Sequence, residues 1–153
     1  MTYRILALSI ATLLIGNAYA APLKPEDQIK IRKAGYSFMA WNMGKIKANI
    51  DGNFNKDEAA KAAAAIAAIS NSGMGALYGA GTDKDIGDTK TRVKAEFFQE
   101  QDKVRELAGA FNKEANELAK VAAGGELAAL RAQFGKTGET CKACHDKFRK
   151  EDH

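Results

Sequence analysis

Three residues near the end of the chain, Cys141, Cys144 and His145, have side chains that form thioethers and ligate metals. They lie in the sequence Cys-Lys-Ala-Cys-His, which is the C-x-x-C-H pattern of covalent haem attachment. In such a site each thiol adds to one vinyl group of the porphyrin, and a neutral imidazole binds the iron. The motif therefore predicts one covalently attached haem c per chain, with His145 as an axial iron ligand.

Two other kinds of site use similar residues. A C-x-x-C redox pair belongs to a βαβ context, whereas this sequence has the periodicity of helices. A structural zinc site takes four ligands, and the only other histidine of the chain, His153, is its last residue. Haem attachment is therefore the interpretation that the motif favours.

The position of the motif bears on the second axial ligand. Eight residues follow His145, and none of them is methionine. The commonest c-type fold has its motif near the N-terminus and takes a methionine ligand from far downstream. Any second ligand in this chain must therefore come from an earlier segment.

The first twenty residues have the pattern of an export signal. Arg4 lies in a short basic start, an apolar run of about eleven residues follows, and Ala18-Tyr19-Ala20 is a small-x-small cleavage pattern. A retained membrane anchor is the alternative, but the run is too short to span roughly 30 Å of hydrocarbon. We expect residues 1–20 to be a cleaved signal peptide and residues 21–153 to form one exported domain without a membrane segment.

The charges of the chain are interspersed. Lys and Arg number 23 against 19 Asp and Glu, and the formal net charge is +4 at pH 7. Mixed signs along the chain indicate a solvated surface rather than a nucleic-acid footprint, so no nucleic-acid partner is expected.

Four helical segments follow from periodicity and end signals. The first begins at Pro25 and ends at Asp51, with apolar residues near a 3.6-residue period at Ile29, Tyr36, Met39, Met43, Ile46 and Ile50. The others run from Asn55 to about Ile69, from Glu96 to Ala122, and from Leu127 nearly to the end. A glycine-rich connection over 71–94 has no phosphate-binding motif. The pattern predicts an all-α, antiparallel four-helix bundle with haem in the core near the C-terminal helix.

The chain resembles the cytochrome c-prime family over essentially its whole length after residue 20. The resemblance is carried by residues 25–27 followed by Arg32, by residues 91–98, and most specifically by residues 141–149. Ala95 and Phe98 depart from the family, which usually has Pro and Trp there. The resemblance implies a periplasmic homodimer with five-coordinate, high-spin iron that transfers electrons or binds nitric oxide and carbon monoxide. It names no redox partner protein.

The resemblance also suggests roles for individual residues. Tyr36 matches the position that faces the distal side of the haem, where related six-coordinate bundles carry methionine. Arg149 is placed beside the proximal imidazole, although a cation near a helix C-terminus is also favoured by the helix dipole alone. Arg32 is expected to pair with a haem propionate, the alternative being a solvent-exposed side chain. Further expected haem contacts are Lys33, Thr91, Arg92 and Glu96.

Several alternatives remain open from the sequence. Met39 lies one helical turn from Tyr36, so it is either a core residue or an axial ligand that makes a six-coordinate electron carrier. A haem enzyme, such as a peroxidase or a nitric-oxide reductase, would need distal proton donors beyond Tyr36. We therefore expect that this protein is not an enzyme. We expect the homodimer to form through the apolar surface of Met43, Ile46 and residues 59–68. Trp41 is expected to lie either in an interface or in the core.

Overall fold

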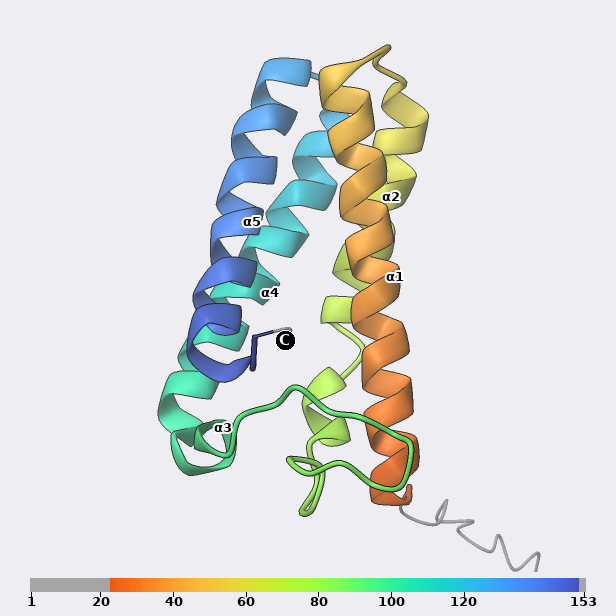
Figure 1. The fold of residues 1–153 in the computed structure, drawn as a ribbon. Coiled ribbons are helices and arrows are strands. Elements are labelled where there is room, and N and C mark those ends of the chain that lie inside the picture. The colour runs from red at the N-terminus through yellow and green to blue at the C-terminus, as the bar shows by residue number, and fades with distance from the viewer. Residues whose placement is uncertain (1–22, 152–153) are drawn as a thin grey trace, which may run out of the picture.

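The computed structural model describes residues 23–151, so the predicted signal peptide and the cleavage site lie outside the described residues. Four long helices and two short ones follow in the order α1 (Pro25–Asp51), α2 (Lys56–Ser70), η1 (Met74–Leu77), α3 (Glu96–Gln99), α4 (Gln101–Gly124) and α5 (Leu127–Phe148). The long helices run side by side and alternate in direction (Figure 1). The described residues form two isolated β-bridges but no strand. The predicted antiparallel four-helix bundle is therefore confirmed.

Local signals in the sequence account for the helix ends. Pro25 opens α1, followed by acidic residues that complement the helix dipole. The side chain of Asn55 accepts a hydrogen bond from the Glu58 backbone N–H at 3.1 Å and caps α2. Helix α4 ends before Gly125, whose φ of 83° lies in the left-handed region that favours glycine.

The third predicted helix is not continuous. Glu100 leaves the helical region with φ −105° and ψ 55°, and it separates α3 from α4. The break lets α3 turn its Phe97 ring toward α5, where the ring centroid lies 5.5 Å from that of Phe148. The Glu100 carboxylate also pairs with the Lys147 ammonium of α5 at 2.6 Å. The prediction of one helix from Glu96 to Ala122 is therefore wrong, because contacts with α5 override the local helical periodicity.

The buried apolar cluster occupies only one half of the bundle. It lies at the end where α1 joins α2 and α4 joins α5, the upper end in Figure 1, and comprises Met39, Ile46, Ile50, Ala59, Ala62, Ala63, Ile66, Ala115, Leu118, Ala122 and Leu130. The alanine side chains of α2 are small, so the backbones of α1 and α4 can both approach it closely. Residues from all four long helices therefore form the apolar core of this half.

This packing corrects the predicted dimer surface. Ile46 and four alanines within 59–68 are buried inside the chain itself. Trp41 is 57% exposed, so it is not a core residue. The apolar surface that α1 presents to solvent instead contains Ile31, Phe38 and Trp41.

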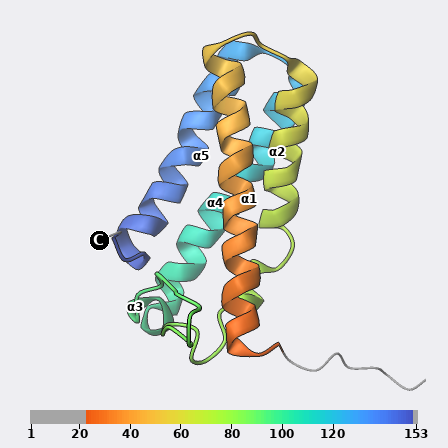
Figure 2. The same cartoon turned by 45° about the vertical axis from the view of Figure 1, so that its right-hand side comes forward.

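At the opposite end, α1 and α5 diverge (Figure 2), and the 78–95 connection crosses between them. This connection is fastened to the end of α5 by backbone hydrogen bonds. Lys94 N donates to Phe148 O at 2.9 Å, and Lys150 N donates to Arg92 O at 2.7 Å. The last turn of α5 is thereby held against the connection.

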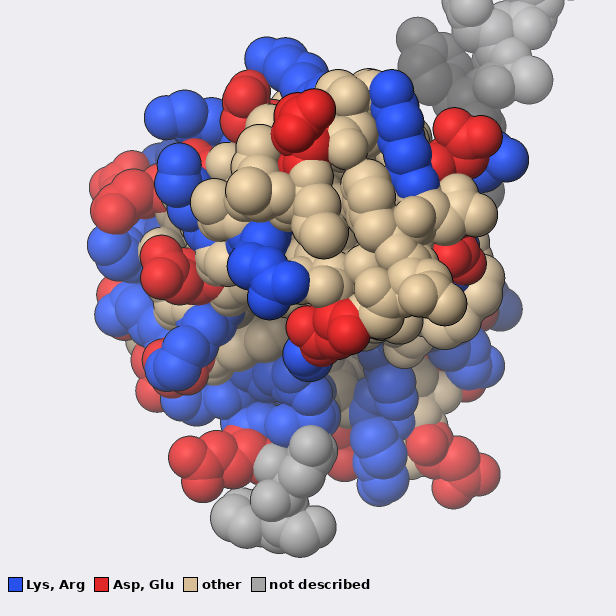
Figure 3. Space-filling view, turned by 90° about the horizontal axis from the view of Figure 1, so that it is seen from above, with Lys and Arg blue, Asp and Glu red and all other residues tan. Residues whose placement is uncertain are grey.

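Within residues 23–151, no helix is long and apolar enough to cross a membrane. Seen along the bundle axis, acidic and basic side chains lie next to each other around the rim (Figure 3). This view shows no surface of a single charge sign, which agrees with the interspersed charges of the sequence.

Candidate haem site

The last turns of α5 carry the C-x-x-C-H motif. Cys141 and His145 are one helical turn apart, and Cys144 precedes the histidine. Both cysteines are half-buried free thiols. Burial raises the pKa of both thiols, that of Cys141 also through its proximity to Cys144. The two thiols lie three positions apart on one helix, and neither is held in a disulfide.

Tyr36 lies across from this motif on α1. Protein atoms around its hydroxyl raise the pKa of Tyr36, and the thiols of Cys144 and Cys141 raise it further, so all three lie within electrostatic range. The Tyr36 hydroxyl accepts a hydrogen bond from the hydroxyl of Tyr78 at 3.1 Å. The predicted distal residue and the predicted attachment residues are therefore close enough to interact electrostatically, and the distal role of Tyr36 stays a prediction.

The packing of this half of the bundle fits a flat apolar group. Helix α4 contributes no buried residue before Ala115, and α5 contributes none between Thr137 and Phe148. Tyr36 remains 41% exposed although it lies within electrostatic range of the thiols of α5. Among the described apolar side chains at this end, only Ile29 and Phe148 are fully buried, at 0% and 3% exposure. A porphyrin attached at Cys141 and Cys144 would supply the missing contact surface.

His145 has electrostatic neighbours that favour its neutral form. Partial burial lowers the pKa of His145, and the positive charges of Arg149 and Arg92 lower it further. Arg149 Nη1 lies 3.5 Å from His145 Nδ1. A neutral imidazole is the form that binds iron. The predicted proximity of Arg149 to His145 is thus present in the structure.

Arg32 is buried and fully engaged by the connection between η1 and α3. It is 2% exposed, and its guanidinium donates to Leu77 O at 3.1 Å, to Thr82 Oγ1 at 2.9 Å, to Thr82 O at 2.6 Å and to Thr91 Oγ1 at 2.6 Å. The alternative of a solvent-exposed arginine is therefore wrong. Contact with a propionate stays a prediction.

The other predicted haem contacts are distributed around the same connection. Lys33 Nζ donates to Lys90 O at 3.1 Å, and Arg92 Nε donates to Lys150 O at 3.0 Å. Glu96 is exposed at the start of α3. Lys33 and Arg92 thus fasten the connection to α1 and to the end of α5, and direct contact of Lys33, Arg92 or Glu96 with haem stays a prediction.

Comparison with known proteins decides the family. The family model for cytochrome C' matches residues 27–149. The chain is 57% identical over 136 residues to the cytochrome c' of Allochromatium vinosum, covering 89% of this chain and 88% of that relative. It is 59% identical over 132 residues to the cytochrome c' of Rhodocyclus tenuis, covering 86% and 99%. This chain belongs to the cytochrome c' family.

Solved cytochrome c' structures have the same fold. The crystal structure from Thermochromatium tepidum superposes with a TM-score of 0.84 at 55% identity, covering 86% of this chain and all of that chain. A second cytochrome c', described as having a ligand-controlled dimer dissociation, gives a TM-score of 0.85 at 57% identity with the same coverage. The chain is accordingly a c-type haem protein of the cytochrome c' family.

Met39 belongs to the apolar core of this family member. It is 6% exposed and belongs to the buried cluster that includes Ile46 and Ile66. Binding to iron would require its side chain to leave that cluster, at the cost of a cavity in the core. Met39 is thus a packing residue in the structure, and its role as a ligand is the less favoured alternative.

Tyr78 is a site residue that the sequence reasoning missed. Its ring stacks on Phe97 with centroids 4.3 Å apart and an interplanar angle of 21°, and Arg32 Cζ lies 4.5 Å from its centroid. A signal was available, because Tyr78 is the only aromatic residue in the glycine-rich stretch 71–94. An aromatic residue in a flexible connection usually has a packing partner elsewhere in the chain.

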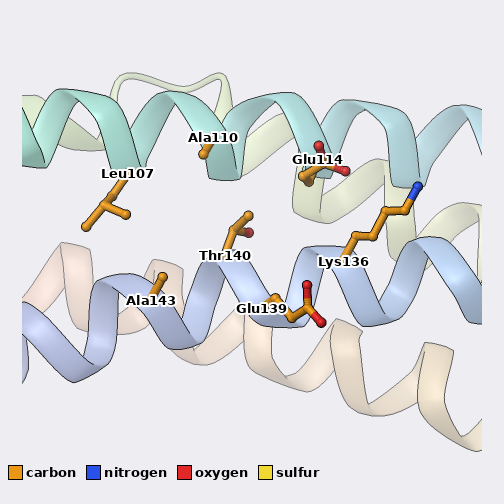
Figure 4. A pocket seen from close by; sticks show the side chains of 7 residues that line it. All are labelled: Leu107, Ala110, Glu114, Lys136, Glu139, Thr140 and Ala143. Atoms are coloured by element: carbon orange, nitrogen blue, oxygen red, sulfur yellow. The ribbon is translucent and has the colours of Figure 1, made fainter.

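A shallow groove of about 320 Å³ runs along the contact between α4 and α5 (Figure 4). It is lined by Leu107, Ala110, Glu114, Lys136, Glu139, Thr140 and Ala143. Neither α1 nor a thiol of the motif lines it. Ala143 lies between the two cysteines in the sequence, so the groove borders the motif on its α4 side.

Proposed function

We propose that this cytochrome c' carries one haem c bound through Cys141 and Cys144, with five-coordinate, high-spin iron ligated by His145. Tyr36 covers the sixth position. The protein serves electron transfer, binding of diatomic gases such as nitric oxide and carbon monoxide, or both, without catalytic turnover. The observation that carries this proposal is the electrostatic influence of the Cys144 and Cys141 thiols of α5 on the Tyr36 phenol of α1, which raises the pKa of Tyr36.

The chemistry of Tyr36 supports an iron position that is covered but not ligated. A neutral phenol is a poor metal ligand, and burial raises the pKa of Tyr36 above its ordinary value near ~10. Haem iron supplies the redox change and the coordination site for a diatomic ligand. Cys141 and Cys144 would fix the porphyrin ring, and His145 would bind the iron. Tyr36 would restrict the access of ligands to the opposite side of the iron.

The proposal that the protein does not catalyse a reaction is based on the acid and base groups around the site. His145 is the only histidine among residues 23–151, and as an axial ligand it cannot also act as an acid or base. Burial raises the pKa of both Tyr36 and Tyr78, which makes them weak proton donors at neutral pH. A peroxidase or nitric-oxide reductase is therefore the less favoured function, and so is a six-coordinate carrier that uses Met39.

Absorption spectra of the purified holoprotein test this proposal. High-spin ferric and ferrous spectra, together with a new ferrous spectrum under carbon monoxide, are the expected result. A low-spin ferrous spectrum that Met39→Ala converts to high spin would establish the six-coordinate alternative instead. Steady-state turnover of peroxide or nitric oxide at rates typical of enzymes would refute the non-enzymatic role.

We also propose a homodimer formed through α1. Ile31, Phe38 and Trp41 are 46%, 48% and 57% exposed, and the Phe38 and Trp41 ring centroids lie 5.3 Å apart. Together they form an apolar stripe that the other described residues, within 23–151, leave about half exposed. A related cytochrome c' with ligand-controlled dimer dissociation supports association in this chain.

Export to the periplasm, with cleavage after Ala20, completes the proposal. It rests on the basic and apolar pattern of residues 1–20. Mass spectrometry of protein expressed with a haem-attachment system should give a chain that begins at Ala21 and carries one haem. A mass that retains residues 1–20 would refute the cleavage, and a mass without haem would refute covalent attachment.

A further inference from the structure

Tyr78 is the anchored member of a pair of tyrosines. It follows η1 directly, and its ring is held by stacking on Phe97 and by the guanidinium of Arg32. Arg32 is in turn fixed by its four hydrogen bonds to Leu77, Thr82 and Thr91. A sideways movement of the Tyr78 ring would disturb all of these contacts.

One side of α1 holds the whole segment in place. Gly79 N donates to Gln28 Oε1 at 2.8 Å, one helical turn before Arg32. Gly35 leaves space for Met74, since a Cβ at Gly35 would lie 2.9 Å from Met74 Cε. Positions 28, 32 and 35 have helical spacing. Residues 74–82 are therefore docked along one stripe of α1.

Tyr36 is next on this stripe, and it is the less restrained member of the pair. It is 41% exposed, and its hydroxyl accepts the hydrogen bond from Tyr78 at 3.1 Å. We propose that Tyr78 is a positioning residue whose hydroxyl holds the Tyr36 phenol over the open iron position and thereby slows the binding of diatomic ligands. This inference rests on the proposed function, because it requires Tyr36 to cover that position.

The hydrogen bond adds to the work of displacing Tyr36. A ligand that reaches the iron must move the Tyr36 ring, and Tyr78 cannot follow because Phe97 and Arg32 hold it. The bond between the hydroxyls therefore has to break during entry. A single hydrogen bond of ordinary strength corresponds to a roughly 2- to 10-fold change in rate.

Carbon monoxide binding to the ferrous holoprotein, followed after rapid mixing, tests the pair. Tyr78→Phe keeps the ring and removes the hydroxyl, so we expect carbon monoxide to bind roughly 2- to 10-fold faster. Tyr36→Phe should accelerate binding by a similar factor. The double variant should be no faster than either single variant, because both remove the same bond. Ser72→Ala, which removes a hydroxyl that bonds to Ile69 O, is the matched control and should leave the rate unchanged.

Tyrosine vibrational spectra provide a readout independent of ligand binding. The chain has four tyrosines, and Tyr3 and Tyr19 precede the expected mature start, so Tyr36 and Tyr78 alone contribute. Ultraviolet resonance Raman spectra of the ferrous protein should show one phenol that donates a hydrogen bond, Tyr78, and one that accepts it, Tyr36. In Tyr78→Phe, the remaining Tyr36 bands should lose the acceptor signature.

The outcomes separate this inference from the proposed function. If Tyr78→Phe leaves both the rate and the Tyr36 bands unchanged while Tyr36→Ala accelerates binding, Tyr78 does not position Tyr36, and the proposed function stands. Additive effects in the double variant would also overturn the pairing. If Tyr36→Ala leaves the rate unchanged, Tyr36 does not cover the iron position, and both proposals fail.

Discussion

Replacing Arg32 by methionine should destabilise the protein far more than a typical single substitution. The guanidinium is 2% exposed and donates four hydrogen bonds, to Leu77 O, to Thr82 through both its Oγ1 and its O, and to Thr91 Oγ1. Methionine has a similar length but no donor, so it preserves most of the packing volume and leaves these acceptors without their partner. The substitution thus isolates the hydrogen bonds from the loss of volume.

The magnitude follows from the number of bonds. At a net contribution of about 1 kcal/mol for each hydrogen bond, the loss in the free energy of unfolding is about 3–4 kcal/mol. For a domain of this size, such a loss lowers Tm by roughly 10–15 °C. Because the arginine stays charged at all relevant pH values, the effect should not depend on pH.

Urea unfolding of the ferric holoprotein, followed by far-ultraviolet circular dichroism, measures this loss. Lys33→Met is the matched control, since Lys33 is the neighbouring residue on α1, is exposed, and makes one hydrogen bond to Lys90 O. Its cost should stay within about 0.5 kcal/mol. If Arg32→Met costs no more than Lys33→Met, the buried network does not stabilise the fold, and the reasoning from these bonds is wrong.

Three further predictions concern other parts of the molecule. Tyr36→Met should place a thioether over the iron and convert the ferrous spectrum from high spin to low spin; an unchanged spectrum would show that this position does not reach the iron. Trp41→Ser should weaken the dimer by at least about tenfold in Kd, because it removes a half-exposed aromatic ring from the apolar stripe, and sedimentation velocity over a concentration series measures this; an unaltered Kd places the interface elsewhere. The hydrogen bond from Thr91 N lowers the pKa of Asp85, and the Lys90 ammonium lowers it further. The stabilising contribution of ionised Asp85 is therefore present above the ordinary carboxyl pKa near ~4, and it is lost as pH falls through the lowered value. Asp85→Asn should therefore show a smaller loss of urea midpoint between pH 6 and pH 3 than the wild type, and identical losses in the two proteins would contradict the assignment.

Local sequence signals determined the cofactor chemistry and most helix ends of this protein. The attachment motif lies within the five residues from Cys141 to His145, so its spacing on a helix needs no long-range contact to be interpreted. The starts of α1 and α2 follow from Pro25 and from the Asn55 cap, which act on their own first turns. The bundle follows from the periodicity of these helices, because each has one apolar stripe to bury.

Tertiary structure decided which apolar residues are available to a partner and where the third helix breaks. Exposure depends on which helices pack together, and the periodicity of α2 alone does not show that its alanines face both α1 and α4. The break at Glu100 likewise depends on α5, since Lys147 and Phe148 lie far along the chain from α3. Local propensity favours a continuous helix there, and contacts between distant segments override it.

The roles of Arg32 and Tyr78 were also decided by tertiary structure. Arg32 bonds to residues 45 to 59 positions away, and Tyr78 bonds to Tyr36 across 42 positions. Such pairs are invisible to helical periodicity, which relates residues three or four positions apart. The family resemblance implied that Tyr36 faces the haem. Only the folded chain places a second phenol within hydrogen-bond distance of it, because the glycine-rich connection has no periodic pattern that specifies its path.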